Sequence, residues 1–171
     1  ELTVQATGTW TGAVSDDWNV AGNWCGLVPT NTVDVVIPAS PESGRFPHIY
    51  NVATAYAQNL FLFTGSSVTI ENGGVLSLAA NLTNNGLIDI KSGGLATLTG
   101  NAGNQSGATI TINSGAEMEL YGNLTNDGTA SLGAGTLELL GTSSQQIGGT
   151  ASTEIGELII GNSYSGIALT L

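Results

Sequence analysis

The sequence predicts an all-β protein, a right-handed parallel β-helix with about 20–22 residues per coil and three short strands in each coil. The first observation behind this prediction is a repeated phrase. Residues 81–86 read Asn-Leu-Thr-Asn-Asn-Gly, and residues 123–128 read Asn-Leu-Thr-Asn-Asp-Gly. Looser copies start at residues 59 and 101, so successive copies are 22, 20 and 22 residues apart. A fixed period in this range is typical of a solenoid.

Short segments that alternate apolar and polar residues are the second observation. The second copy, for example, contains Ile-Asp-Ile at residues 88–90 and Ala-Thr-Leu at residues 96–98. Alternation with a period of two places the apolar side chains on one face of a strand. Turns rich in glycine and asparagine separate the segments, and no stretch has the length and period of a helix. We therefore expect strands throughout.

Composition is the third observation, and it also excludes several functions. The 171 residues are 41% hydrophobic and only 9% charged, with 25 glycines, which is too apolar for a disordered chain and sufficient for one domain with a core. The net charge is −11, with Lys91 and Arg45 as the only basic residues besides one histidine, so nucleic-acid binding is not expected. No apolar run approaches the roughly 18 residues of a membrane span, so membrane insertion is not expected either.

Residues 1–38 are predicted to form an N-terminal cap unit. They contain all three tryptophans, Trp10, Trp18 and Trp24, and end in a strand-like segment that Pro38 stops. The first coil of a solenoid needs a cover, and tryptophan buries more area than other residues. Clustered tryptophans can also stack on sugars, so these three are the candidate ligand-binding residues, with an extracellular glycan as the candidate partner.

The same unit contains four side chains of the kind that calcium binds. They are Asp16, Asp17, Asn19 and Asp34, which offer hard oxygen ligands. Their spacing matches no EF-hand, and the alternative is that Asp16 and Asp17 cap turns. Calcium is the one cofactor for which the sequence offers candidate ligands.

Residues 39–58 are predicted to be a loop and the entry to the first coil, because proline and glycine interrupt them. This segment contains His48, the single histidine, which we expect to be a hydrogen-bonded structural residue. Cys25 is expected to be a small buried hydrophobe. His48 and Cys25 lack a credible third group for nucleophilic catalysis, and the sequence offers no other catalytic set, so no catalytic residue is predicted.

Residues 59–171 are predicted to be the coils, continuous with the cap unit in one domain. Aligned residues of successive coils stack at strand spacing, about 4.8 Å. The alignment predicts three inward columns: Leu78, Leu98, Leu120 and Leu139; Ile70, Ile90, Ile112 and Leu132; and Leu60, Leu82, Ala102 and Leu124. It also predicts an asparagine ladder of Asn59, Asn81, Asn101 and Asn123, each amide bonding to the next. Glu119 and Glu138 share an outward column, where they could hold a cation but are expected to splay into water.

Residues 146–171 are predicted to be one more coil. Leu158 and Ile160 extend one inward column, and Ile167, Leu169 and Leu171 extend another. The alternation runs to the last residue without a capping segment. We therefore expect a C-terminally truncated module whose open edge is covered by further coils of the parent chain or by another copy of this chain. Copies stacked in this way would form a filament.

One stretch carries a resemblance to a known group of proteins. Residues 10–24 read Trp-Thr-Gly-x-x-Ser-x-Asp-Trp-Asn-x-x-x-Asn-Trp, followed by Val-Pro-Thr at residues 28–30 and both Asn-Leu-Thr-Asn phrases. This order of phrases resembles a module of large secreted or cell-surface bacterial proteins exported by type IX secretion. The resemblance implies a non-catalytic β-helical stretch outside the cell. Cys25 departs from the pattern, and the sorting domain of such proteins is not in this sequence.

Three classes of function remain open. The first is a structural module that acts as a stalk, scaffold or adhesion segment. The second is surface recognition, in which a glycan-binding module is favoured over an ice-binding face, because a charge interrupts the column of Thr69, Asp89, Thr111 and Ser131. The third is a fragment of a polysaccharide-active β-helix enzyme, which would need a basic proton acceptor where the chain offers only Lys91 and Arg45. We expect a non-catalytic module.

Overall fold

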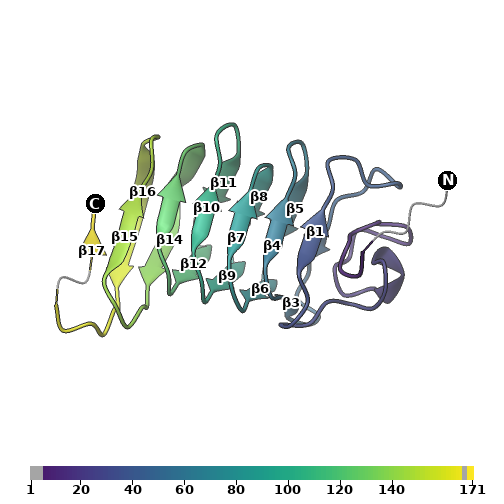
Figure 1. Ribbon diagram of the computed structural model, residues 1–171, viewed down its shortest axis with the longest axis horizontal. Helices are drawn as coiled ribbons and strands as arrows, with labels where there is room; N and C mark the ends of the chain where they lie inside the picture. Colours follow the sequence, from purple (N-terminus) through teal and green to yellow (C-terminus); the bar gives the residue numbers. More distant parts are fainter. Residues whose placement is uncertain (1–5, 167–168) are drawn as a thin grey trace.

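The protein is a parallel β-helix of stacked coils, seen in a computed structural model that describes residues 6–166 and 169–171. Figure 1 shows the coils side by side along a rod, with the N-terminal segment wrapped over one end. In the described residues the one helical element is η1 (Ala21–Asn23), a single 3-10 turn. The predicted fold class is confirmed.

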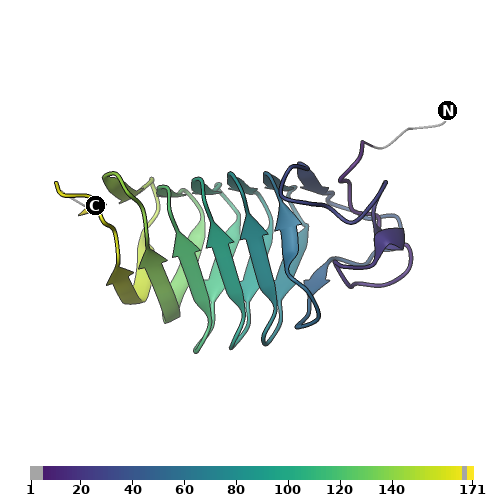
Figure 2. The same cartoon turned by 90° about the horizontal axis from the view of Figure 1, so that it is seen from below.

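Each of the first four coils contributes one strand to each of three parallel faces, named the first, second and third sheet, and the last two coils join the second and third into one continuous ten-stranded sheet. The first sheet contains β1 (Val35–Ile37), β4 (Leu60–Leu62), β7 (Leu82–Asn84), β10 (Ala102–Asn104), β13 (Leu124–Asn126), β15 (Gln145–Gly148) and β17 (Leu169–Thr170). The second contains β2 (His48–Ile49), β5 (Ser67–Ile70), β8 (Leu87–Ile90) and β11 (Thr109–Ile112). The third contains β3 (Ala55–Ala57), β6 (Val75–Leu78), β9 (Leu95–Leu98) and β12 (Glu117–Leu120). Figure 2 shows the same coils from below, as successive rungs.

The last two coils join their second and third strands into one. β14 (Thr129–Leu139) pairs with both β11 and β12, and β16 (Thr153–Ile160) pairs with β14 along its length. The register shifts between Leu132 and Thr136, where Gly133 and Gly135 occupy the corner. A Cβ atom on Gly135 would lie 2.3 Å from a side-chain carbon of Ile112, so the chain can bend there only without a side chain.

The three predicted inward columns form the core. All twelve residues are at most 3% exposed, and they align in the predicted register from coil to coil. Val35, Ile49 and Ala57 extend the columns by one coil toward the N-terminus. Burial of each leucine or isoleucine contributes about 1.5–3 kcal/mol, so the stacked columns are a major source of stability.

The expectation that residues 39–58 form a loop is wrong for their second half. β2 and β3 lie there and pair with β5 and β6, so the stack begins at Val35 rather than at Asn59. Ile49, Ala55 and Ala57 are fully buried. Strands of two and three residues, the second of them with alanine as its inward residue, are too short for a period of two to reveal them.

The N-terminal cap packs against the first coil, as the tryptophan content predicts. Trp24 makes edge-on contacts with Trp10 and Trp18, with ring centroids 4.9 and 4.7 Å apart. The backbone of Trp10 donates to Val36 on β1, and the backbone of Trp18 donates to His48 on β2. The cap therefore covers the first edges of two sheets.

Asn23 holds the cap loop together from inside. Its side chain is fully buried, and its Oδ1 accepts from the backbone N–H groups of Val14 and Ser15, at 2.9 and 2.8 Å. Its Nδ2 donates to Ser15 Oγ and to the carbonyl of Asp17. One amide thus satisfies four polar groups of a segment that has almost no regular secondary structure.

The predicted asparagine ladder exists, but it bonds differently. Asn59, Asn81 and Asn101 each accept, through Oδ1, the backbone N–H of the asparagine one coil on, at 2.8–3.0 Å. Within this ladder, in the part of the chain that the structure describes, one contact joins two amides, from Asn81 Nδ2 to Asn59 Oδ1 at 3.3 Å. The expectation that each amide bonds to the next is therefore wrong at the other steps, because the strand-entry N–H is the nearer donor.

A second ladder lies inside the helix, and sequence reasoning missed it. Asn84, Asn104 and Asn126 are fully buried, and each Nδ2 of the first two donates to the next Oδ1, at 2.9 and 2.8 Å. These residues stand two positions after Leu82, Ala102 and Leu124 and so share their inward phase. This spacing from the inward residues was the sequence signal that could have predicted buried asparagines.

Candidate functional site

The predicted sugar-stacking tryptophans are buried in the cap. Trp10 and Trp18 are fully buried and Trp24 nearly so. Trp10 Nε1 donates to the carbonyl of Arg45 at 2.7 Å, and Trp24 Nε1 donates to the carbonyl of Trp18 at 2.6 Å. Because no ring face is exposed, the assignment of these three residues to ligand binding is wrong, and they serve the cap.

The calcium candidates do not form one site. Asp17 Oδ1 accepts the backbone N–H of Asn19 at 2.8 Å, a turn contact, and Asn19 Nδ2 donates to the carbonyl of Ala53. Asp34 Oδ1 accepts from Asn59 Nδ2 at 2.7 Å and so begins the outer asparagine ladder. Within residues 6–166 and 169–171, Asp16, Asp17 and Asp34 do not converge as a ligand group. Turn and ladder contacts occupy Asp17, Asn19 and Asp34, which corrects the prediction.

A carboxylate cluster lies instead on the outer face of the third sheet. Glu117 and Glu119 on β12 and Glu138 on β14 place carboxylate oxygens within 4.8 Å of one another. Glu119 and Glu138 are aligned neighbours, and Glu119 Oε2 also accepts from Thr97 Oγ1 at 2.9 Å. The expectation that Glu119 and Glu138 splay into water is therefore wrong. Carboxylates at this spacing can bind a divalent cation or share a proton.

The electrostatics of this cluster favour proton sharing. Partial burial, a hydrogen bond with Glu138 and the charges of Glu138, Glu119 and Glu157 raise the pKa of Glu117. Like charges at strand spacing disfavour the fully ionised state, and one proton between two carboxylates relieves the repulsion. The cluster is half-buried, so solvent screens part of this effect.

His48 has the structural contacts expected of it. Its Nδ1 lies 2.7 Å from Glu71 Oε1, and its ring stacks on Tyr50 with centroids 5.9 Å apart. Partial burial, followed by the charge of Asp16, raises the pKa of the Tyr50 hydroxyl. Cys25 is half-buried in the cap rather than in the core, and its backbone N–H donates to Thr9. These contacts join the cap to the first two coils.

The C-terminal end of the rod exposes apolar surface. Ile160 aligns with buried Leu139 but is 51% exposed, because among the described residues no strand covers β16 on its outer side. Leu158 and Leu169 are partly buried against the core, whereas Leu171 is exposed. An apolar hollow of about 360 Å³ lies there, lined by Ile147, Gly148, Gly149, Ala151, Thr153, Ile155 and Leu171. Ile167, predicted to face inward, lies outside the described residues.

Comparison with known proteins gives one family. A family model described as a domain of unknown function (DUF8693) matches residues 9–121, which run from the cap to the end of the fourth coil's third strand, β12. No curated protein and no solved structure matches the chain. In the described residues, no helix has the length and apolar character to cross a membrane.

Proposed function

We propose that this chain, which belongs to the DUF8693 family of domains of unknown function, is a non-catalytic structural module of a secreted or cell-surface protein. It acts there as a stalk, scaffold or adhesion segment. The observation that carries the proposal is the uninterrupted register of the first sheet, in which β1, β4, β7, β10, β13 and β15 pair in parallel without a break. A continuous ladder of this kind separates the two ends of the module by a fixed distance.

The two asparagine ladders support the same role. The outer ladder links successive coils through side-chain oxygens, and the inner ladder does so through buried amides. Buried polar groups that are fully hydrogen-bonded fix one register and resist sliding of one coil over the next. A spacer benefits from such rigidity.

The resemblance to modules of proteins exported by type IX secretion supports the extracellular location. The net charge of −11 suits solubility. The second candidate is a glycan-binding module, which is favoured by an uncharged groove at the corner between the first and second sheets.

Deletion of residues 81–122, two whole coils, tests the structural proposal. The deletion places β13 directly on β4, so Leu62 meets Asn126 as it now meets Asn84. The shortened chain is expected to fold, to remain accessible to added protease on intact source cells, and to be shorter by about 10 Å, two strand spacings. Spin labels on the cap and on β15 report that distance.

Two outcomes contradict the proposal. A broad distance distribution in the intact chain would exclude a rigid spacer. Protection from protease on intact cells, with cleavage after lysis, would exclude the surface location. The glycan-binding alternative makes a different prediction. Loss of the two coils removes the groove and should abolish glycan binding, although the shortened rod still holds its two ends apart.

A further inference from the structure

We infer that the corner between the first and second sheets at the third coil is a binding site for a neutral saccharide. A groove of about 430 Å³ lies there, lined by Thr64, Gly65, Ser66, Ser67, Asn85, Gly86, Leu87, Gly107 and Thr109. This inference goes beyond the spacer role and does not depend on it, because a rigid rod can present a binding site on any coil.

Unequal turn lengths create the groove. Four residues, 63–66, connect β4 to β5, and four, 105–108, connect β10 to β11, but only residues 85–86 connect β7 to β8. In Figure 1 the teal loop between β7 and β8 stands lower than its two neighbours. The shorter repeat in the 22, 20, 22 spacing therefore corresponds to a notch between two projecting turns.

Glycine at position 86 lets the short turn lie directly against the backbone of the preceding turn. A Cβ atom on Gly86 would lie 2.2 Å from the carbonyl oxygen of Ser66 and 2.9 Å from that of Phe63. Gly65 and Gly107, on the two projecting turns, have φ values of +86° and +82°, a backbone conformation that favours glycine. Glycines at these positions therefore allow the turn conformations that border the groove.

The lining has the chemistry of a neutral polar ligand. It contains the hydroxyls of Thr64, Ser67 and Thr109, which have no hydrogen-bond partner in the part of the chain that the structure describes. No charged side chain lines the groove. The nearest acid along β8, Asp89, forms an ion pair with Lys91 at 2.5 Å. The groove therefore offers neither a carboxylate for a cation nor a basic group for an anion.

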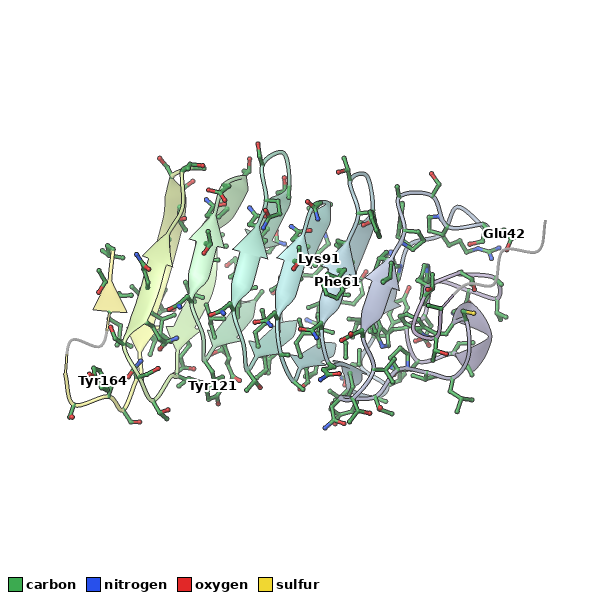
Figure 3. All side chains as sticks on the ribbon, viewed as in Figure 1. Glu42, Phe61, Lys91, Tyr121 and Tyr164 are labelled. Atoms are coloured by element: carbon green, nitrogen blue, oxygen red, sulfur yellow. The ribbon has the colours of Figure 1, made fainter. Side chains whose placement is uncertain are left out.

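Apolar surface lies beside these hydroxyls. Leu87, in the groove, is 36% exposed, and Phe63, at the start of the projecting turn, is 54% exposed. Phe61, labelled in Figure 3, adds a further exposed ring on the outer face of β4. A sugar ring combines hydroxyl groups with an apolar C–H face, so it matches a groove whose lining combines hydroxyls with the exposed aliphatic side chain of Leu87.

The second short turn provides a contrast within the same chain. Residues 127–128 connect β13 to β14, but there Thr150 of the next coil donates both its backbone N–H and its hydroxyl to Asp127 Oδ1, each at 2.8 Å. That corner is bridged by the chain itself and bears a charge. Thr129 takes the place of Leu87 in the aligned column. Of the corners at residues 85–86 and 127–128, the first combines an open notch with an uncharged lining, and the second does not.

An array of neutral and acidic oligosaccharides tests the site, followed by calorimetric titration of the best neutral binder. Leu87→Glu is expected to weaken binding at least about tenfold, because it adds a charge and removes the apolar contact. Thr109→Val removes one hydroxyl and is expected to weaken binding roughly fivefold. The matched controls are Thr129→Glu, on the same column, and Thr111→Val, on the same strand outside the groove, each expected to stay within about twofold.

Thermal melts first establish which of the four variants are folded. If Leu87→Glu does not fold, Thr109→Val alone tests the groove. The site is overturned if no neutral oligosaccharide binds, if acidic ones bind as tightly as neutral ones, or if the groove variants bind like their controls. The deletion of residues 81–122 separates this test from that of the spacer. Loss of binding with retained surface exposure supports both proposals, whereas retained binding overturns the groove alone.

Discussion

Residues that look alike in the repeated phrase have different tasks. In Asn-Leu-Thr-Asn, the first asparagine lies on the outside and accepts one backbone N–H from the next coil. The last asparagine lies inside, as does Asn104 of the looser copy, which donates to Asn126 Oδ1 and to the carbonyl of Thr129 while its Oδ1 accepts from Asn84. Removal of the inner amide leaves several buried partners unsatisfied, and each such partner carries a desolvation cost.

We expect Asn104→Ala to lower the free energy of unfolding by about 2–4 kcal/mol, because Asn84, Asn126 and Thr129 each lose a partner. Asn101→Ala removes one exposed acceptor and should cost about 1 kcal/mol or less. Denaturant unfolding of both variants measures the difference. Equal losses would mean that the inner ladder is no more important than the outer one.

The raised pKa of Glu117 predicts a pH dependence with a definite sign. Between the ordinary glutamate pKa and the raised value, the folded state binds more protons than the unfolded state. The contribution of this group to stability is therefore fully present at low pH and is lost as pH rises through the raised pKa. Glu117→Gln should raise the melting temperature at pH 7 by about 1–2 °C and give no gain near pH 4.

Glu42→Gln is the control for that experiment. Glu42 is exposed in the loop between β1 and β2 and lies at the cap end of the rod, away from the cluster, as Figure 3 shows. Its substitution should leave the melting temperature unchanged at both pH values. A gain for Glu117→Gln that is as large at pH 4 as at pH 7 would exclude relief of charge repulsion as its cause.

Sequence patterns determined the inward columns but not the polar contacts. Period-two alternation is a local property, so Leu98 or Ile90 could be assigned to the core from its neighbours in the chain. The partners of Trp10 and Asp34 are Arg45 and Asn59, residues distant in sequence whose proximity depends on how the cap folds back and on how the first two coils stack. This long-range dependence is why the sequence left ligand roles open for the tryptophans and acids of the cap beside their structural roles.

Among the elements, the cap differs most from the rest. It has one 3-10 turn and isolated bridges to β1 and β2, so buried side chains and hydrogen bonds of Asn23 replace a strand ladder. The tryptophan content was enough to predict the cap. The first coil beneath it was not predicted, because its strands are only two and three residues long. The turn of residues 85–86 was likewise visible as a shorter repeat, but its effect on the surface required the neighbouring turns.

We expect Asn23→Ala to destabilise the cap by about 2–4 kcal/mol, because four hydrogen bonds of a buried amide are lost. All three tryptophans lie in the cap, so tryptophan fluorescence follows its unfolding separately from circular dichroism of the coils. The fluorescence transition should move to lower denaturant than the dichroism transition. Asn19→Ala, which removes one side-chain contact to Ala53, is the control and should leave both transitions together.

At the scale of the whole molecule, each coil contacts only its neighbours, so protection should depend on position along the rod. β7 and β10 have a coil on either side, whereas β16 has a paired strand on one side only among the described residues. Amide hydrogen exchange followed by mass spectrometry should be slowest in β7 and β10 and fastest in β16. Protection of β16 equal to that of β10 would show that its outer edge is covered in solution.

The parallel register of the coils also has a mechanical consequence. The hydrogen bonds between coils run along the long axis of the rod, so a pull on its two ends loads successive coils in series. Each coil that detaches releases about 20–22 residues, or roughly 70 Å of extended chain at about 3.3–3.6 Å per residue. We expect single-molecule stretching to give a sawtooth of about that spacing. A tether built this way lengthens under load by yielding one rung at a time, and it keeps its two ends connected while it does so.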